Sequence, residues 1–234
     1  MNKITSHIYM TNGLRGTGIL STNVYYITDT KLTIIDTGYK GKLSQISRDI
    51  KKLGYSLSDV ENIVLTHYHI DHTGNLLKLK QITGANIIAH IDDVPYIEGR
   101  LPHPCPKALK HLKFMERFWN PDPVDVDVKV KDGDILPILG GIKIIHTPGH
   151  TLGSISLHIP QEDALIIGDL LANTFKLSLP SREFTVDIKE EIQSINKIAD
   201  MKFNIVCFGH GLPLMKNAND GVKQFSVKLK KYHS

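Results

Sequence analysis

The sequence predicts an α/β fold in which two stacked β-sheets carry helices on their outer faces. Three observations predict it. Short apolar runs typical of strands alternate with segments of helical periodicity, each half of the chain runs through strands first and a helix later, and no linker-like stretch separates the halves. We therefore expect one domain over residues 1–234, although no residue-level repeat relates the two halves.

The first half of the chain begins with a predicted hairpin. In NVYYITDTKLTIIDTG, residues 23–38, β-branched and aromatic residues cluster on both sides of a polar turn. Apolar residues then recur at helical spacing over residues 42–53, and a short apolar run at residues 62–66 predicts a buried strand. A helix is expected from just after His72 to near Gly84, and the run NIIAH predicts the next strand, so that the order is a βαβ alternation.

The pattern changes between Tyr96 and Asp127. The proline-rich PHPCP leads into PKALKHLKFMERFW, in which four apolar residues share one helical face: Leu109, Leu112, Met115 and Trp119. We predict an inserted helical lid at about residues 100–121.

The second half is predicted to continue with short strands separated by Gly and Pro. They lie in VKVKDGDI, GIKIIHT, SISLHIP and ALIIGDL, which begin at residues 128, 141, 154 and 164. Residues 187–201 then repeat apolar side chains at helical spacing. The strand NIVCFG and a lysine-rich C-terminal helix close the chain.

Composition narrows the classes of partner. The formal net charge of +4 comes from 28 basic and 24 acidic residues scattered along the chain, which is too dispersed to indicate a nucleic-acid-binding surface. The first residues lack the apolar core of a signal peptide, and no run is long enough to cross a bilayer. We expect a cytoplasmic monomer or homodimer that acts on a small molecule, with no nucleic-acid or membrane partner. Cys105 and Cys207 lie far apart without CxxC spacing and are expected to be unpaired thiols.

The strongest chemical signal is THYHIDHTG, residues 66–74, which places three histidines and an aspartate directly after a predicted strand. Imidazole and carboxylate together suit zinc, iron or manganese. We expect a loop here, because on a helix only residues three or four apart share a face. At a strand end, His67 and His69 project to the same side, while Asp71 and His72 turn with the chain toward a neighbouring site. The motif therefore predicts two adjacent metal sites.

Three further residues of ligand type end predicted strands downstream. His150 follows a tight Pro-Gly turn in IIHTPGHTLGS, Asp169 ends ALIIGDL, and His210 lies between glycines in NIVCFGHG. Each context is weak individually, but together with the first motif they indicate a specific metal centre.

These motifs carry a resemblance to a known family. THYHIDHTG, TPGHT, IIGDLL and CFGHG occur in the order and context of the metallo-β-lactamase-like superfamily, and IIDTG resembles its early aspartate motif. The match runs from about Asn23 to Gly211, nearly the whole chain. The resemblance implies a four-layer αββα sandwich with the active site at one edge of the paired sheets.

The resemblance also implies a ligand set for two divalent metal ions, with zinc as the first expectation and iron or manganese as alternatives. It assigns His67, His69 and His150 to one ion, and Asp71, His72 and His210 to the other. Asp169 would be the bridging carboxylate, and Asp36 in IIDTG would support the ligand loops by hydrogen bonding.

The function expected from these residues is metal-dependent hydrolysis. A hydroxide held between two metals would attack an ester, thioester, lactone or amide carbonyl, with Asp71 as a candidate for proton transfer. True β-lactamases of the superfamily generally lack an aspartate that bridges both metals, so Asp169 favours members that resemble hydroxyacylglutathione hydrolase or lactonases. The alternatives are a persulfide dioxygenase with a single iron, a phosphodiesterase or nuclease, a β-lactamase, and a non-catalytic binding or sensor protein.

Substrate contacts are expected from the lid and from the loop at residues 173–182. The candidates combine aromatic, amide and cationic side chains: Phe114, Trp119, Asn173, Phe175, Lys176 and Arg182. Such a mixture would seat an anionic substrate with an apolar portion. The alternative is that the lysines of the lid form its solvated outer face while the aromatic residues pack inward.

Overall fold

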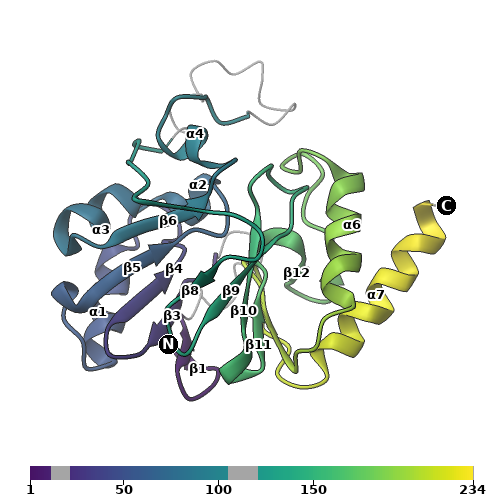
Figure 1. The fold of residues 1–234 in the computed structure, drawn as a ribbon, viewed down its shortest axis with the longest axis horizontal. Coiled ribbons are helices and arrows are strands. Elements are labelled where there is room, and N and C mark those ends of the chain that lie inside the picture. The colour runs from purple at the N-terminus through teal and green to yellow at the C-terminus, as the bar shows by residue number, and fades with distance from the viewer. Residues whose placement is uncertain (12–21, 105–120, 234) are drawn as a thin grey trace.

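The computed structural model describes residues 1–11, 22–104 and 121–233. Two β-sheets lie face to face, and helices cover the outer side of each sheet (Figure 1). This is the four-layer αββα sandwich that the resemblance implies, so the expected fold class is confirmed.

The first sheet has seven strands in chain order, antiparallel up to the fourth strand and parallel from there on. The predicted hairpin at residues 23–38 is its third and fourth strand, which pair from Tyr25 opposite Ile35 to Thr28 opposite Leu32. The seven strands are β1 (Asn2–Lys3), β2 (Ile8–Met10), β3 (Tyr25–Thr28), β4 (Leu32–Ile35), β5 (Val60–Val64), β6 (Asn86–His90) and β7 (Val128–Val130).

The second sheet has five strands and is antiparallel except for one parallel pair, β11 with β14. Its strands in chain order are β8 (Ile135–Leu136), β9 (Ile142–His146), β10 (Ile155–Ile159), β11 (Ala164–Ile166) and β14 (Ile205–Cys207). A separate short hairpin joins β12 (Ala172–Asn173) to β13 (Leu177–Ser178).

The helices divide between the two outer layers (Figure 1). On the first sheet lie α1 (Leu43–Lys52) and α3 (Leu76–Thr83), and on the second lie α6 (Ile188–Ala199) and α7 (Ala218–His233). Short helical turns complete the described chain: η1 (Leu57–Asp59), α2 (Ile70–Thr73), α4 (Val94–Ile97), η4 (Pro160–Glu162) and η5 (Gly168–Leu170). None of the helices in the described ranges is long and apolar enough to span a membrane.

Three hydrophobic clusters fill the three spaces between the layers. Neighbouring residues of one strand supply different clusters, because side chains alternate across a sheet. Ile34 of β4 packs with Ile46 and Ile50 of α1, whereas Ile35 faces the space between the sheets. The same alternation in both sheets explains why their strands are apolar on both faces.

Two predicted elements differ from the structure in their boundaries. The helix expected after His72 begins earlier, at Ile70, and is interrupted before α3 begins at Leu76. The interruption coincides with long-range contacts, since the Asn75 amide donates hydrogen bonds to the carbonyl oxygens of Thr37 and Tyr39 and so holds the chain away from a continuous helix. The His-rich window is therefore a loop only as far as His69.

The segment VKVKDGDI is not one strand. Its first residues form β7 in the first sheet and its last residue begins β8 in the second sheet, so the chain crosses between the sheets here. The turn around Gly133, where φ is +86°, makes this change of direction possible. The predicted lid at residues 100–121 lies mostly in residues 105–120, which are outside the described residues.

Candidate metal centre

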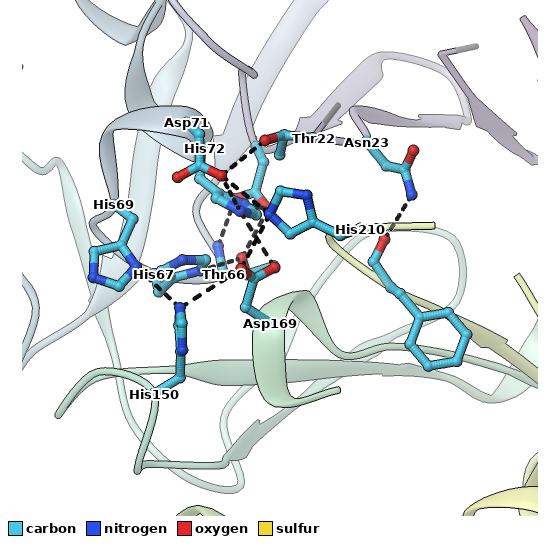
Figure 2. A network of polar contacts seen from close by, with 12 residues as sticks. Thr22, Asn23, Thr66, His67, His69, Asp71, His72, His150, Asp169 and His210 are labelled. Atoms are coloured by element: carbon cyan, nitrogen blue, oxygen red, sulfur yellow. Dashed lines mark hydrogen bonds and ion pairs between the residues drawn. The ribbon is translucent and has the colours of Figure 1, made fainter. Parts of the chain in front are cut away.

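The seven predicted ligands lie where strands of both sheets end. Two of them follow β5, two lie in α2, and one each follows β9, β11 and β14. Figure 2 shows these side chains turned toward one another, although they come from sequence positions up to 143 residues apart, from His67 to His210. They form two groups whose ligand atoms lie within 4.8 Å of one another, and the members are His67, His69 and His150, and then Asp71, His72, Asp169 and His210.

The first group is a set of three imidazoles. Nδ1 of His69 lies 3.0 Å from Nε2 of His150, and the two rings stand at 90° to each other. Burial, and then the neighbouring histidines, lower the pKa of His67 and His69 well below the ordinary value. Burial also lowers the pKa of His150, to about 4. All three rings are therefore neutral at pH 7, the form in which imidazole donates a lone pair to a metal.

The second group pairs two imidazoles with two carboxylates. Nε2 of His210 lies 3.1 Å from Oδ2 of Asp71 and 3.2 Å from Oδ2 of Asp169, and Nε2 of His72 lies 3.4 Å from Oδ1 of Asp169. Thr22 donates a hydrogen bond to Oδ2 of Asp71 at 2.9 Å. The two imidazoles of this group thus pair with its two carboxylates.

The pKa shifts of the second group follow from this pairing. Burial disfavours the imidazolium of His210, but Asp169 and Asp71 outweigh it and raise the pKa to about 10. The same opposition, with Asp169 as the largest favourable partner, raises the pKa of His72. Burial acts against the Asp169 carboxylate, but His210 and His72 hold its pKa well below the ordinary value. A metal ion that displaces the protons on Nε2 of His72 and His210 would supply the positive charge in their place.

Asp169 lies between the two groups. Its Oδ2 is 3.6 Å from Nε2 of His150 in the first group and 3.2 Å from Nε2 of His210 in the second (Figure 2). Gly209 makes room for this carboxylate, since a Cβ at that position would lie 2.0 Å from Oδ1 of Asp169.

Asp36 supports the segment from Thr66 to His72 by hydrogen bonds to its carboxylate. Its Oδ1 accepts a hydrogen bond from the backbone of Thr66 at 2.8 Å, and its Oδ2 accepts from Oγ1 of Thr66 and from Nδ1 of His72 at 2.7 and 2.8 Å. These are hydrogen bonds of the kind that the resemblance implies for this residue. They hold Nδ1 of His72, so that Nε2 faces the centre and would offer its lone pair to a metal ion that displaces its proton.

The donor set fits metal ions. Among the described residues, Nε2 of His67, Nε2 of His72 and Oδ1 of Asp169 are buried side-chain atoms with no hydrogen-bond partner, although the last two form an ion pair at 3.4 Å. Buried polar atoms normally have such a partner, so three of them that converge call for a ligand. Imidazole and carboxylate donors in this number suit zinc, iron or manganese.

A cavity of about 460 Å³ opens onto the two groups. Its wall is mainly apolar and includes Ile70, Leu179, Pro180 and Phe184, with Tyr39 beside the ligands. Burial, and then Asp71 and Asp169, raise the pKa of Tyr39 to about 12, which keeps the phenol protonated. Tyr39 and Phe184 were missed in the sequence, although Tyr39 directly follows the IIDTG motif.

The predicted substrate contacts have different positions. The hairpin of β12 and β13 borders the cavity, but its wall as described does not include Asn173, Phe175, Lys176 or Arg182. Phe175 is 93% exposed, and Asn173 donates a hydrogen bond to the carbonyl of Leu212. Their contact with substrate stays a prediction. Phe114 and Trp119 lie outside the described residues.

A third group of metal-binding residue types lies apart from the centre and consists of His90, Asp92 and His146. The two rings stack in parallel at 3.9 Å, which points their lone pairs in parallel rather than at one point. Nε2 of His146 lies 2.9 Å from the Leu152 carbonyl, and Nδ1 of His90 accepts from the Asp92 backbone. We therefore assign no metal to this group.

Comparison with known proteins places the chain in a family. A model of the metallo-beta-lactamase superfamily matches residues 17–210. A probable metallo-hydrolase of Bacillus subtilis strain 168 is 25% identical over 93% of this chain and 91% of its own length. A hydroxyacylglutathione hydrolase of Hyphomonas neptunium is 30% identical over 52% of this chain, but this match spans 36% of that enzyme.

Solved structures agree on the fold. A metallo-beta-lactamase family protein of Thermus thermophilus superposes with a TM-score of 0.77 at 20% identity, over 99% of this chain and 80% of that one. The subclass B3 metallo-beta-lactamase BJP-1 of Bradyrhizobium japonicum superposes with a TM-score of 0.72 at 23% identity, over 99% and 90%. With a family model that covers most of its length, the chain belongs to the metallo-beta-lactamase superfamily.

Proposed function

We propose that this metal-dependent hydrolase uses two divalent metal ions to cleave an ester, thioester or lactone bond of a small molecule. The observation that carries the proposal is the position of Asp169, whose Oδ2 is within 3.6 Å of a ligand nitrogen in each group. A carboxylate placed in this way would be within reach of both ions. The three imidazoles of the first group would hold one ion, and Asp71, His72 and His210 the other.

Two ions in such a site would polarise the carbonyl of the substrate and supply, from bound water, a nucleophile at neutral pH. The chain's own residues set the geometry for this. Asp36 orients His72, and Thr22 orients Asp71 through the hydrogen bond to Oδ2. Asp71 lines the cavity and pairs with His210, and we retain it as the candidate for proton transfer.

The cavity supports a carbonyl substrate with an apolar portion. Ile70, Leu179 and Phe184 provide a surface for an acyl or ring substituent next to the ligands. Tyr39 keeps its proton at neutral pH because its pKa is raised to about 12, so its hydroxyl is available as a hydrogen-bond donor to the substrate oxygen.

One relative supports the same class of bond, since it is named a hydroxyacylglutathione hydrolase and the acyl group of such a substrate is held as a thioester, although the match spans 36% of that enzyme. The name of the probable metallo-hydrolase supports hydrolysis without naming a bond. The superpositions on solved structures concern the fold alone, since they lie below 25% identity. The carboxylate between the two groups argues against β-lactam cleavage as the main activity.

The test is a panel of hydrolysis assays on the zinc-loaded protein with a thioester, a lactone, a phosphodiester and a β-lactam. We expect turnover of the thioester or the lactone, and loss of it in Asp169→Asn together with loss of bound metal. Asp125→Asn is the matched control, because Asp125 is an exposed aspartate. Turnover of the phosphodiester or β-lactam alone would overturn the proposed bond class. A single iron in the protein as purified, before zinc is added, together with no hydrolysis would point to a dioxygenase.

A further inference from the structure

We propose that Asp93 is a positioning residue for the three-imidazole group, because its carboxylate ties together the two loops that carry His67, His69 and His150. The inference rests on the proposed metal centre and adds to it a residue that none of the ligand motifs contains. Asp93 precedes α4 in the first half of the chain and is 1% exposed.

Three hydrogen bonds end on this carboxylate. Oδ2 accepts from the backbone N–H of Tyr68 at 3.0 Å and from Oγ1 of Thr151 at 2.8 Å. Oδ1 accepts from the backbone N–H of Gly153 at 2.7 Å. Tyr68 stands between His67 and His69, and Thr151 directly follows His150, so one side chain reaches both ligand loops.

The two loops need such a link because they belong to different sheets. His67 and His69 follow β5 of the first sheet, and His150 follows β9 of the second. Tyr68 and Thr151 are both buried, at 1% and 0% exposure, so water does not replace a lost acceptor. A buried N–H or O–H without a partner is costly, so the loops are expected to shift rather than leave these donors unpaired.

The chain leaves space for this carboxylate at Gly153. A Cβ there would lie 2.6 Å from the backbone nitrogen of Asp93 and 2.7 Å from Oδ1. Ser154 reinforces the same loop, since its Oγ lies 2.8 Å from Oγ1 of Thr151 and accepts from the Thr151 backbone at 3.0 Å. The glycine and the serine of TLGS thus shape the loop around Asp93.

We expect a change at Asp93 to weaken the binding of the ion held by the three imidazoles more than that of the other ion. Asp93 bonds to the loops of the three-imidazole group, whereas the second group has its own supports in Asp36, which holds His72, and Thr22, which holds Asp71. Outer hydrogen-bonding partners of metal ligands typically contribute 10- to 100-fold in metal affinity. A residue that only stabilised the fold would weaken both ions alike.

The experiment is a cobalt(II) titration of the full-length metal-free protein, followed by visible absorption, with thermal unfolding of each variant before metal is added. Asp93→Asn keeps the shape of the side chain and removes its charge and one acceptor. Asp92→Asn is the control, because Asp92 is the adjacent aspartate and its side chain is 53% exposed. His69→Ala identifies the binding step that belongs to the three-imidazole group.

We expect Asp93→Asn to lower the cobalt affinity of the step identified by His69→Ala by about 10- to 100-fold and to leave the affinity of the other step unchanged. Asp92→Asn should titrate like the wild type at both steps. Unchanged affinity at both steps, or an equal loss at both, would overturn the inference. If Asp93→Asn does not fold, Thr151→Val removes one of the three donors at constant shape and is held to the same two criteria.

The failure of the proposed function looks different. If the wild-type chain takes up fewer than two cobalt ions, the dinuclear centre is wrong whatever Asp93 does. The inference on Asp93 is then decided at the one remaining site: it stands if Asp93→Asn weakens that ion and His69→Ala does too, and it is wrong otherwise.

Discussion

At the residue scale, Gly209 lies against two of the candidate metal ligands, Asp169 and His72. A Cβ at this position would come within 2.0 Å of Oδ1 of Asp169 and 2.8 Å of the His72 ring. We therefore expect Gly209→Ala to lose most of its bound metal and at least about tenfold in hydrolysis, because both ligands must move. Metal analysis and the thioester or lactone assay measure this.

The control for this substitution is Gly221→Ala in α7, where a Cβ meets only ordinary contacts with Leu214 and Leu177 at 3.4 and 3.8 Å. This variant should keep metal and activity and gain up to about 1 kcal/mol of stability, since Ala favours a helix over Gly. A metal content in Gly209→Ala equal to that of Gly221→Ala would contradict the crowding argument.

A second residue-scale effect concerns pH. Burial, and then the stacked His146 ring, lower the pKa of His90 to about 4, against the favourable charges of Asp92, Asp132 and Asp134. Between about pH 6.5 and 4 the unfolded chain therefore binds a proton at His90 that the folded chain does not. The contribution of this residue to stability is complete above about pH 6.5 and is lost as pH falls toward 4.

The prediction is tested with urea unfolding of the metal-free protein at pH 7.5 and pH 5. The wild type should lose more free energy of unfolding between these two conditions than His90→Gln, which has no such proton to bind. Equal losses in the two proteins would show that His90 does not titrate in this way.

At the scale of elements, α6 supports the turn that carries His150. Oδ1 of Asp187 caps the helix by accepting from the backbone of Lys189 at 2.8 Å and of Glu190 at 3.1 Å. One turn further on, Ser194 donates to the Pro148 carbonyl at 2.7 Å, and the Asp187 backbone donates to the Gly149 carbonyl at 2.9 Å. The helix start and the His150 turn are thus one connected unit.

We expect Asp187→Ala to lower the free energy of unfolding by about 1 kcal/mol, as loss of an N-cap does. Chemical unfolding measures it, and Asp187→Ser, which keeps a capping oxygen, should recover most of the loss. No difference between Asp187→Ala and Asp187→Ser would contradict the role of the cap.

Elements show where sequence reasoning succeeds and where it stops. The hairpin at residues 23–38 was predictable because its strands and turn are adjacent in the sequence. The early start of α2 at Ile70 was not, since the interruption before α3 depends on contacts of Asn75 with Thr37 and Tyr39, more than 30 residues away. The spacing of apolar residues along a short segment does not indicate a contact between residues so far apart in the sequence.

The candidate site divides in the same way. The seven residues of the two groups were visible because four of them share the motif THYHIDHTG and the other three each end a predicted strand in a short motif. Asp93 was not, because its importance comes from donors 25, 58 and 60 residues away, at Tyr68, Thr151 and Gly153. The chemistry of the residue type is readable from sequence, but the partners that orient it are not.

At the scale of the whole molecule, the centre joins the two halves of the sandwich. His67 and His72 come from the side of the first sheet, and His150 and His210 from the second. Metal ions at this centre would bind to the folded chain and not to the unfolded one. Each site would therefore raise the free energy of unfolding by RT ln(1 + [metal]/Kd).

We therefore expect a chelator to lower the midpoint of thermal unfolding, and zinc in excess to restore it. At free metal about 100 times the dissociation constant, the gain is about 2.7 kcal/mol per site. Thermal unfolding with and without chelator measures this, and His67→Ala should respond less than the wild type. A midpoint of thermal unfolding that does not depend on metal would contradict a metal centre that links the two sheets.

The metal content of the purified protein, determined by elemental analysis for the wild type and for Asp169→Asn, decides whether the centre is dinuclear. We expect two divalent ions per wild-type chain and a clear reduction in Asp169→Asn, since that carboxylate lies between the two groups. One ion per chain in both proteins, or two in both, would contradict a dinuclear centre that depends on Asp169.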